Sequence, residues 1–308
     1  MREERISFYS EGLLIAGILR MPEVSESPCP AIVQGPGWLG LKDAKLYLRY
    51  HHALTEAGFA VLIFDYRGFG DSEGANDILL PAMQLEDLIN AVTYLTTRDD
   101  IDADNIGAFG SGGTGGGNSI LLGAHDARVS CVVSQVPVAD GEDWLHRMRS
   151  EYEWLDFQAS LEEDRKQRVL TGKGKKVHPR TGIMVPTPER KKTSIKKDVD
   201  GRIQEEVLLR SAEAICQYKP IDVVHKVAAL LVIGVEGDAT TPTDHAIALY
   251  EGAIEPKKLI MQRHTTHYAA YETYGDQVTP AIVDWFQAHM KRGNLHIRSA
   301  GQQGGVHV

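Results

Sequence analysis

Apolar runs alternate along the chain with amphipathic stretches, and glycine-rich turns separate them. The first two runs, residues 6–9 and 13–19, flank Ser10-Glu11-Gly12 and predict a β-hairpin. Later runs lack polar alternation, which is typical of strands buried on both faces. These strands are expected at residues 31–34, 59–64, 106–109, 129–136, 230–235 and 259–262.

Helical periodicity follows most of these runs. We expect helices at about residues 44–56, 82–95, 114–124, 243–250 and 280–289. Strands that alternate with helices predict an α/β fold, with a mostly parallel central sheet flanked by helices on both faces.

The region between residues 137 and 224 breaks this rhythm. It shows a charged helical pattern at 144–170, a basic irregular segment at 173–197 and a second helical pattern at 205–218, without a clear strand. It is either a solvated surface insertion or a cap over the carboxyl edge of the sheet, where open α/β sheets bind ligands. We therefore divide the chain into an α/β core (1–137 and 223–290), a cap insertion (138–222) and a flexible tail (291–308).

Charge and cysteine content narrow the function classes. The net charge of -9 over 308 residues argues against bulk binding to nucleic acid or an anionic membrane. The three cysteines are scattered and odd in number, so a reducing compartment is expected rather than a disulfide framework. A charged N-terminus and the lack of a long apolar run argue against a secretory signal and a membrane span. We expect a cytoplasmic protein that binds a small-molecule substrate and could form a homodimer.

Residues 106–118 combine an apolar strand, a dense glycine cluster and the start of a helical pattern. This order is typical of a nucleophile elbow, in which a strained strand-to-helix turn exposes a reactive side chain. The small residues of such an elbow flank the reactive position two residues away on each side. Gly110 is the first of them, so the reactive position is Gly112, which has no side chain.

Four further motifs accompany the elbow motif GSGGTGG at residues 110–116. They are QGPGW at 34–38, DYRGFGDSEG at 65–74, GVEGDATTP at 234–242 and TTHY at 265–268. With these motifs in this order, residues 6–289 resemble the α/β-hydrolase superfamily. Within it the chain is similar to the cap-bearing branch of dienelactone-hydrolase-like and bacterial peptidase/esterase-like enzymes. The resemblance implies an α/β-hydrolase fold with an inserted helical cap.

The resemblance also implies that Asp238 is the catalytic acid and His267 the catalytic histidine. Each follows a short apolar strand, so both are expected at the carboxyl edge of the sheet beside the elbow. An imidazole titrates near working pH, and a carboxylate on its far nitrogen fixes the tautomer. His264 is the rival base.

Several explanations of Gly112 stay open. A serine could have been replaced by engineering, which would make the natural protein an ordinary serine hydrolase. Ser111 or Thr114 could take the role of the nucleophile through a shifted register. The natural enzyme could lack a nucleophile, in which case His267 would activate water or abstract a substrate proton. The scaffold could also be a ligand-binding protein without catalysis.

An oxyanion hole is expected from backbone N–H groups. Gly113 supplies one, directly after the elbow position. Related enzymes donate a second from the loop after the first parallel strand, but here that residue is Pro36, which has no N–H. The donor is therefore expected at Gly37 or Trp38.

In the cap, Trp144, Arg147 and Trp154 lie at helical spacings and are candidates for substrate binding. No metal motif stands out, because His264 and His267 lack the spacing of the helical zinc motif. No cofactor is expected, since the glycine cluster lacks the Lys-Ser/Thr of a phosphate loop. The prediction is a hydrolase for an ester, a lactone or a C–C bond beside a ketone, with lyase chemistry as a further option.

Overall fold

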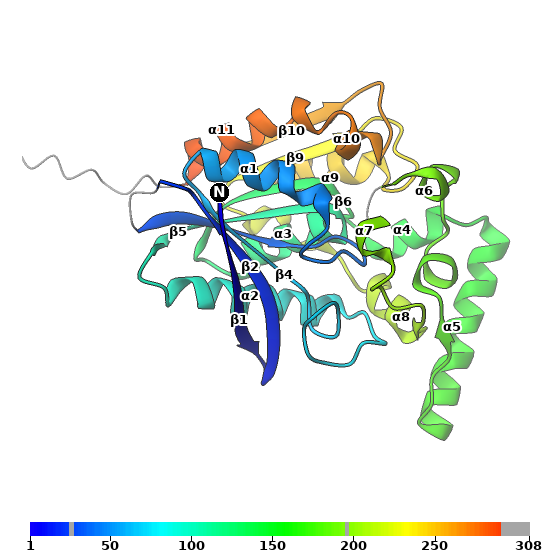
Figure 1. Cartoon of the computed structure of the whole chain (residues 1–308). Coiled ribbons are helices and arrows are strands. Elements are labelled where there is room, and N and C mark those ends of the chain that lie inside the picture. Colours follow the sequence, from blue (N-terminus) through cyan, green and yellow to red (C-terminus); the bar gives the residue numbers. More distant parts are fainter. Residues whose placement is uncertain (25–27, 195–196, 291–308) are drawn as a thin grey trace, which may run out of the picture.

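The computed structural model describes residues 1–24, 28–194 and 197–290. Its centre is an eight-stranded sheet in the order β1-β2-β4-β3-β5-β6-β9-β10 (Figure 1). The hairpin strands β1 and β2 are antiparallel, and β2 also pairs antiparallel with β4, whereas all later neighbours are parallel. The strands are β1 (Arg2–Ser10), β2 (Leu13–Met21), β3 (Cys29–Gly35), β4 (Ala60–Phe64), β5 (Ile101–Gly113), β6 (Val129–Pro137), β9 (Leu230–Val235) and β10 (Lys257–Gln262).

Helices cover both faces of this sheet. On one face α1 (Leu48–Glu56) packs against α11 (Thr279–His289), and on the other lie α2 (Pro81–Thr96), α3 (Thr114–His125) and α9 (Thr243–Gly252). Figure 1 shows α1 and α11 on one side of the sheet and α2 on the opposite side. The predicted α/β fold with a mostly parallel sheet is confirmed.

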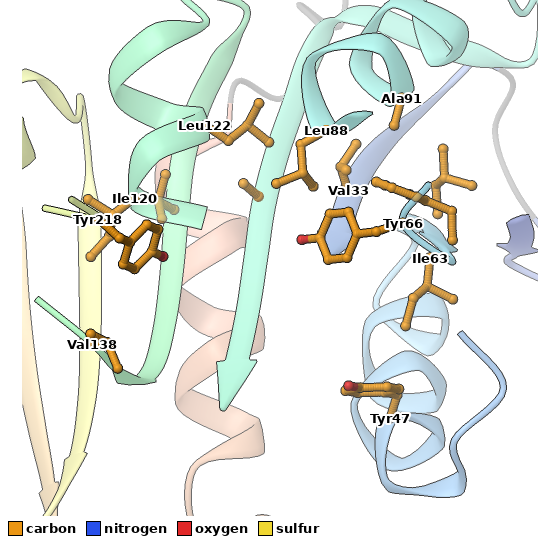
Figure 2. Close-up of a cluster of buried hydrophobic side chains, with 14 of the residues drawn as sticks. Val33, Tyr47, Ile63, Tyr66, Leu88, Ala91, Ile120, Leu122, Val138 and Tyr218 are labelled. Atoms are coloured by element: carbon orange, nitrogen blue, oxygen red, sulfur yellow. The ribbon is translucent and has the colours of Figure 1, made fainter. Parts of the chain in front are cut away.

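The alternation of side chains along each strand explains why the hydrophobic core forms two clusters, one on each face of the sheet. Successive side chains of a strand point to opposite faces, so Ile32 of β3 belongs to the cluster under α1 and α11, while Val33 belongs to the cluster under α2 and α3. Both side chains are fully buried, which is why the parallel strands read as continuous apolar runs. Figure 2 shows the second cluster, where Val33 lies near Tyr66 and Leu88.

Among the described residues, the region between β6 and β9 forms five α-helices and a small separate sheet. Figure 1 shows α4, α5, α6, α7 and α8 gathered at one end of the central sheet. Their bounds are α4 (Gly141–Arg147), α5 (Glu151–Thr171), α6 (Pro188–Lys192), α7 (Lys197–Asp200) and α8 (Arg210–Cys216). A π-helical turn, Pro179–Ile183, lies between α5 and α6.

Two expectations for this region were wrong. The single helix at 144–170 is two helices, because Ser150 caps α5 in a reciprocal capping box with Glu153 and so begins a new helix. A strand was not expected, yet β7 (Lys176–Val177) pairs antiparallel with β8 (Val207–Leu208). The expected helix at 205–218 consequently begins only at Arg210. Strands of two residues are too short to show an alternating pattern.

None of the helices among the described residues combines the length and apolar character needed to cross a membrane. The tail predicted at 291–308 lies outside the described residues.

Candidate active site

The side chains of His267 and Asp238 form a buried pair at the carboxyl edge of the sheet. Asp238 follows β9 and His267 follows β10, and these neighbouring parallel strands end side by side. His267 Nδ1 lies 2.7 Å from Oδ2 of Asp238, and the two side chains are 7% and 1% exposed. An ionised carboxylate only accepts hydrogen bonds, so Nδ1 carries the proton and Nε2 is left as the basic nitrogen.

Backbone groups hold the carboxylate of Asp238 in place. Its Oδ1 accepts hydrogen bonds from the N–H groups of Thr240 at 2.7 Å and Thr241 at 3.0 Å. The rival base His264 is exposed and does not line the pocket beside this pair. The arrangement therefore holds one imidazole, that of His267, in a fixed orientation beside the pocket.

The elbow lies between β5 and α3 and bends at two consecutive glycines. Gly112 has a φ of +78° and Gly113 a φ of +47°, a region that side chains other than glycine's rarely adopt. Gly113 is also the N-cap residue of α3, so the chain turns directly into the helix. Both glycines line the pocket, and neither brings a side chain to it.

The two alternative nucleophiles lie elsewhere. Ser111 is 2% exposed on β5, and Thr114 is 5% exposed at the first position of α3. Neither residue lines the pocket that contains His267. The elbow thus has the bend of a nucleophile turn, and neither of its hydroxyl-bearing residues lines the pocket.

The elbow and the loop after β3 approach each other through glycines. A Cβ atom on Gly37 would lie 2.6 Å from the carbonyl oxygen of Ser111, and one on Gly115 would lie 2.9 Å from Cα of Gly37. Such distances exclude larger residues at both positions. Because its N–H donates to the hydroxyl of Tyr47 at 3.2 Å, Gly37 is already engaged.

A pocket of about 70 Å³ opens between the sheet edge and the region of α4 to α6. A water molecule needs roughly 10–15 Å³ by the same measure, so the pocket can hold several waters or a small acyl group. The core contributes Trp38, Gly112, Gly113, Ala239, Thr240, Thr241, His267 and Tyr268. The region between β6 and β9 contributes Trp144, Met148, Arg180, Met184, Val185, Pro186, Thr187 and Arg190.

Of the three cap residues proposed for substrate binding, the structure brings one to the pocket. Trp144 lines it, packs edge-on against Trp38 at 5.7 Å between ring centroids, and donates its indole N–H to the carbonyl of Thr240. Arg147 instead forms ion pairs of 2.7 Å with Asp143 and Asp244 and does not line the pocket. Trp154 is buried against His146 and does not line it either.

Residues that sequence reasoning missed complete the surroundings. The buried hydroxyls of Tyr271 and Thr241 have no hydrogen-bond partner among the described residues. Tyr271 faces Gly112, and Thr241 faces Gly113. Arg180 and Arg190 bring positive charge to the pocket wall. No periodic signal marks any of them, because their positions depend on how distant loops meet.

Metal-ligand clusters of three or more histidine, cysteine or carboxylate side chains do not occur within the part of the chain that the structure describes.

Comparison with known proteins shows the family and the fold of the chain. Residues 11–269 match the model of the X-Pro dipeptidyl-peptidase (S15) family. An uncharacterized 31.7 kDa protein in the traX-finO intergenic region of Escherichia coli is 31% identical over 287 residues, which cover 91% of this chain and 97% of that protein. The quorum-quenching protein AidA of Acinetobacter baumannii is 36% identical over 137 residues, or 44% of each chain. The crystal structure of the α/β hydrolase GrgF from a Penicillium species has a TM-score of 0.75 at 20% identity, with 94% of this chain and 99% of that chain covered. The α/β-hydrolase fold expected from the sequence is thereby confirmed.

Proposed function

Because the chain belongs to the X-Pro dipeptidyl-peptidase (S15) family and is a hydrolase of the α/β-hydrolase type, we propose that it cleaves a small carbonyl substrate without a side-chain nucleophile. The observation that carries this proposal is a pocket in which an oriented His267–Asp238 pair lies beside two glycines at the elbow. The substrate class is an ester, a lactone or a C–C bond next to a ketone.

In the proposed reaction His267 activates water directly. Its Nε2 takes a proton from a water molecule as the water oxygen bonds to the substrate carbonyl carbon, and the carbonyl π electrons move to the oxygen. The tetrahedral intermediate then collapses, and the leaving group takes the proton back from His267. Asp238 stabilises the imidazolium between these steps without itself accepting the proton.

The developing oxyanion needs donors that are fixed before the reaction. We assign this role to the backbone N–H group of Gly113, which lies at the elbow and lines the pocket. The elbow and the loop after β3 are held together by the close glycine contacts of Gly37 and Gly115, which favours such an arrangement. The N–H of Gly37 is left out, because it donates to Tyr47.

The pocket walls suit a small substrate with an apolar acyl part. Trp38, Trp144 and Met148 supply apolar surface, while the carbonyl group would lie toward His267. Small-molecule pockets commonly combine such apolar walls with a few placed polar groups.

The test is hydrolysis of p-nitrophenyl acetate and of acetyl thioesters by the whole protein and by its His267→Ala variant. We expect the variant to lose about 10²- to 10⁴-fold in kcat. A fluorophosphonate serine probe should leave the mass of the wild-type protein unchanged. Undiminished activity of the variant would remove the base role of His267. Probe labelling at Ser111 or Thr114 would replace the proposal by a serine- or threonine-nucleophile mechanism, and a failure to hydrolyse activated esters would favour a ligand-binding protein.

A further inference from the structure

Tyr271 is a buried tyrosine whose hydroxyl group has no hydrogen-bond partner among the described residues. It lies on α10 (Ala269–Glu272), and 8% of the residue is exposed. Buried hydroxyl groups almost always find a partner, because leaving one without a partner lowers stability. An unsatisfied hydroxyl next to a pocket therefore indicates a partner that binds there.

The hydroxyl of Tyr271 points at the space where Gly112 lacks a side chain. A Cβ atom built on Gly112 would lie 3.5 Å from the hydroxyl oxygen of Tyr271 and 3.9 Å from Cα of Gly37, and apart from the chain neighbours Ser111 and Gly113 no other described residue lies within 4 Å. This space borders the pocket, which Gly112 itself lines. It therefore has room for one small atom within hydrogen-bonding reach of the phenol.

The imidazole of His267 lies on the same side of the elbow. The ring centroids of His267 and Tyr271 are 5.7 Å apart, and the rings are inclined by 66°. Burial is the largest cause that raises the pKa of Tyr271 well above its usual value of 10, and the nearby carboxylate of Asp238 adds to it. The phenol is therefore neutral at working pH and can donate a hydrogen bond, but it does not compete with His267 as a base.

We propose that the hydroxyl of Tyr271 holds the attacking water in the space beside Gly112. The inference rests on the proposed function. Tyr271 donates its proton to one lone pair of the water oxygen, and one O–H of the water points to Nε2 of His267. As the oxygen bonds to the carbonyl carbon through its other lone pair, that proton passes to Nε2, and Tyr271 keeps its own.

The hydroxyl of Thr241 does not take this role. It faces the neighbouring glycine, with its oxygen 4.0 Å from a Cβ atom built on Gly113, and Thr241 lines the open pocket. A partner for Thr241 would therefore lie on the substrate side of the elbow. Of these two hydroxyl groups, it is that of Tyr271 which faces the confined space at Gly112.

The test is the Tyr271→Phe variant, measured with p-nitrophenyl acetate. We expect kcat to fall about 5- to 50-fold, which is the effect of losing one oriented hydrogen bond in the transition state, while KM stays within about twofold. The melting temperature should change little, because the hydroxyl bonds only the water molecule and no protein group among the described residues. A merely structural tyrosine would show a lower melting temperature instead.

Tyr50→Phe is the matched control. Tyr50 lies in the same buried cluster, but its hydroxyl accepts a hydrogen bond from the side-chain amide of Gln135 at 3.2 Å, away from the pocket. This variant should keep its kcat within about twofold.

The outcomes separate the two proposals. If Tyr271→Phe keeps the wild-type kcat while His267→Ala loses activity, the role of Tyr271 is refuted and the proposed function stands. If Tyr271→Phe raises KM without changing kcat, the hydroxyl binds substrate and the water-holding role is also refuted. If His267→Ala is as active as the wild type, both proposals fail.

Discussion

The carboxylate of Glu189 accepts a hydrogen bond from the backbone N–H of Tyr268 at 3.1 Å. The same oxygen, Oε1, also accepts the hydroxyl of Thr266, so Glu189 contacts both neighbours of His267. Glu189 lies on α6 of the region between β6 and β9, whereas His267 lies on a loop of the core. A single side chain of that region thus holds the backbone of Tyr268 on one side of His267 and the side chain of Thr266 on the other.

This contact predicts that Glu189→Ala weakens catalysis through the loop of His267. We expect kcat to fall by about 5- to 150-fold, since two hydrogen bonds worth about 0.5–1.5 kcal/mol each are lost. Glu189→Gln is the matched control, because its amide oxygen still accepts both hydrogen bonds, and it should keep most of the activity. Equal losses in both variants would mean that the negative charge matters, and not the clamp.

Asp238→Asn tests the orientation of the imidazole. The amide would favour the wrong tautomer of His267 and would not stabilise the imidazolium, so kcat should fall by about 10²- to 10⁴-fold. The melting temperature should change little, because the amide oxygen still accepts the N–H groups of Thr240 and Thr241. A fall of less than about threefold would show that this carboxylate does not serve the base.

The position of this pair was readable from the sequence, because Asp238 and His267 each follow a continuous apolar run. Such runs become parallel strands, and parallel strands present their carboxyl ends at one edge. The break between α4 and α5 also had a local signal, since Ser150 and Glu153 have the spacing of a capping box. The helical periodicity of residues 144–170 continues across this break, which is why the prediction of a single helix was wrong.

The polar groups around the elbow could not be predicted in this way. Tyr271 reaches Gly112 across 159 positions of the chain, and no periodicity connects the two. Likewise, the hydrogen bond that occupies the N–H of Gly37 comes from the position of Tyr47 in a turn of 3₁₀ helix. Arg147 lies at a suitable helical spacing, but it forms ion pairs with Asp143 and Asp244 outside the pocket. Such pairings depend on packing between distant segments.

The free energy of unfolding should decrease as the pH falls below neutral, because of the buried ring of His51. Its ring is fully buried, Nδ1 accepts from Arg20 at 2.6 Å and Nε2 lies 2.6 Å from Oε1 of Gln34. Burial is the main cause that lowers the pKa of His51 well below 6.5, and the charge of Arg20 adds to it. Below pH 6.5 the unfolded chain therefore binds a proton that the folded chain does not, so stability falls as the pH falls.

The expected slope is about 1.4 kcal/mol per pH unit below pH 6.5, until the pKa of the folded state is reached. Urea unfolding of the wild type and of His51→Gln at several pH values between 5 and 8 measures it. Carboxyl groups titrate in both proteins, so the difference between the two curves isolates His51. Parallel curves would show that His51 is protonated equally in the folded and unfolded states.

Serine substitutions at the two bend glycines locate the reactive position of the elbow. A Cβ atom on Gly112 or on Gly113 meets no atom closer than 3.5 Å, so both variants should fold. Each should lose about 1–2 kcal/mol in the free energy of unfolding, because a side chain is placed at positive φ. At Gly110, by contrast, a Cβ atom would lie 2.0 Å from the carbonyl oxygen of Gly115, and Gly110→Ala should lose about 3 kcal/mol or more.

We expect Gly112→Ser, and not Gly113→Ser, to react with a fluorophosphonate probe, because a side chain at Gly112 enters the space that Tyr271 and His267 face. Intact mass spectrometry measures the adduct, and His267→Ala in the Gly112→Ser background should abolish it. Labelling of Gly113→Ser alone would move the reactive position by one residue. The space at Gly112 would then not be the position of the nucleophile. The proposed water site beside Tyr271 would be contradicted as well.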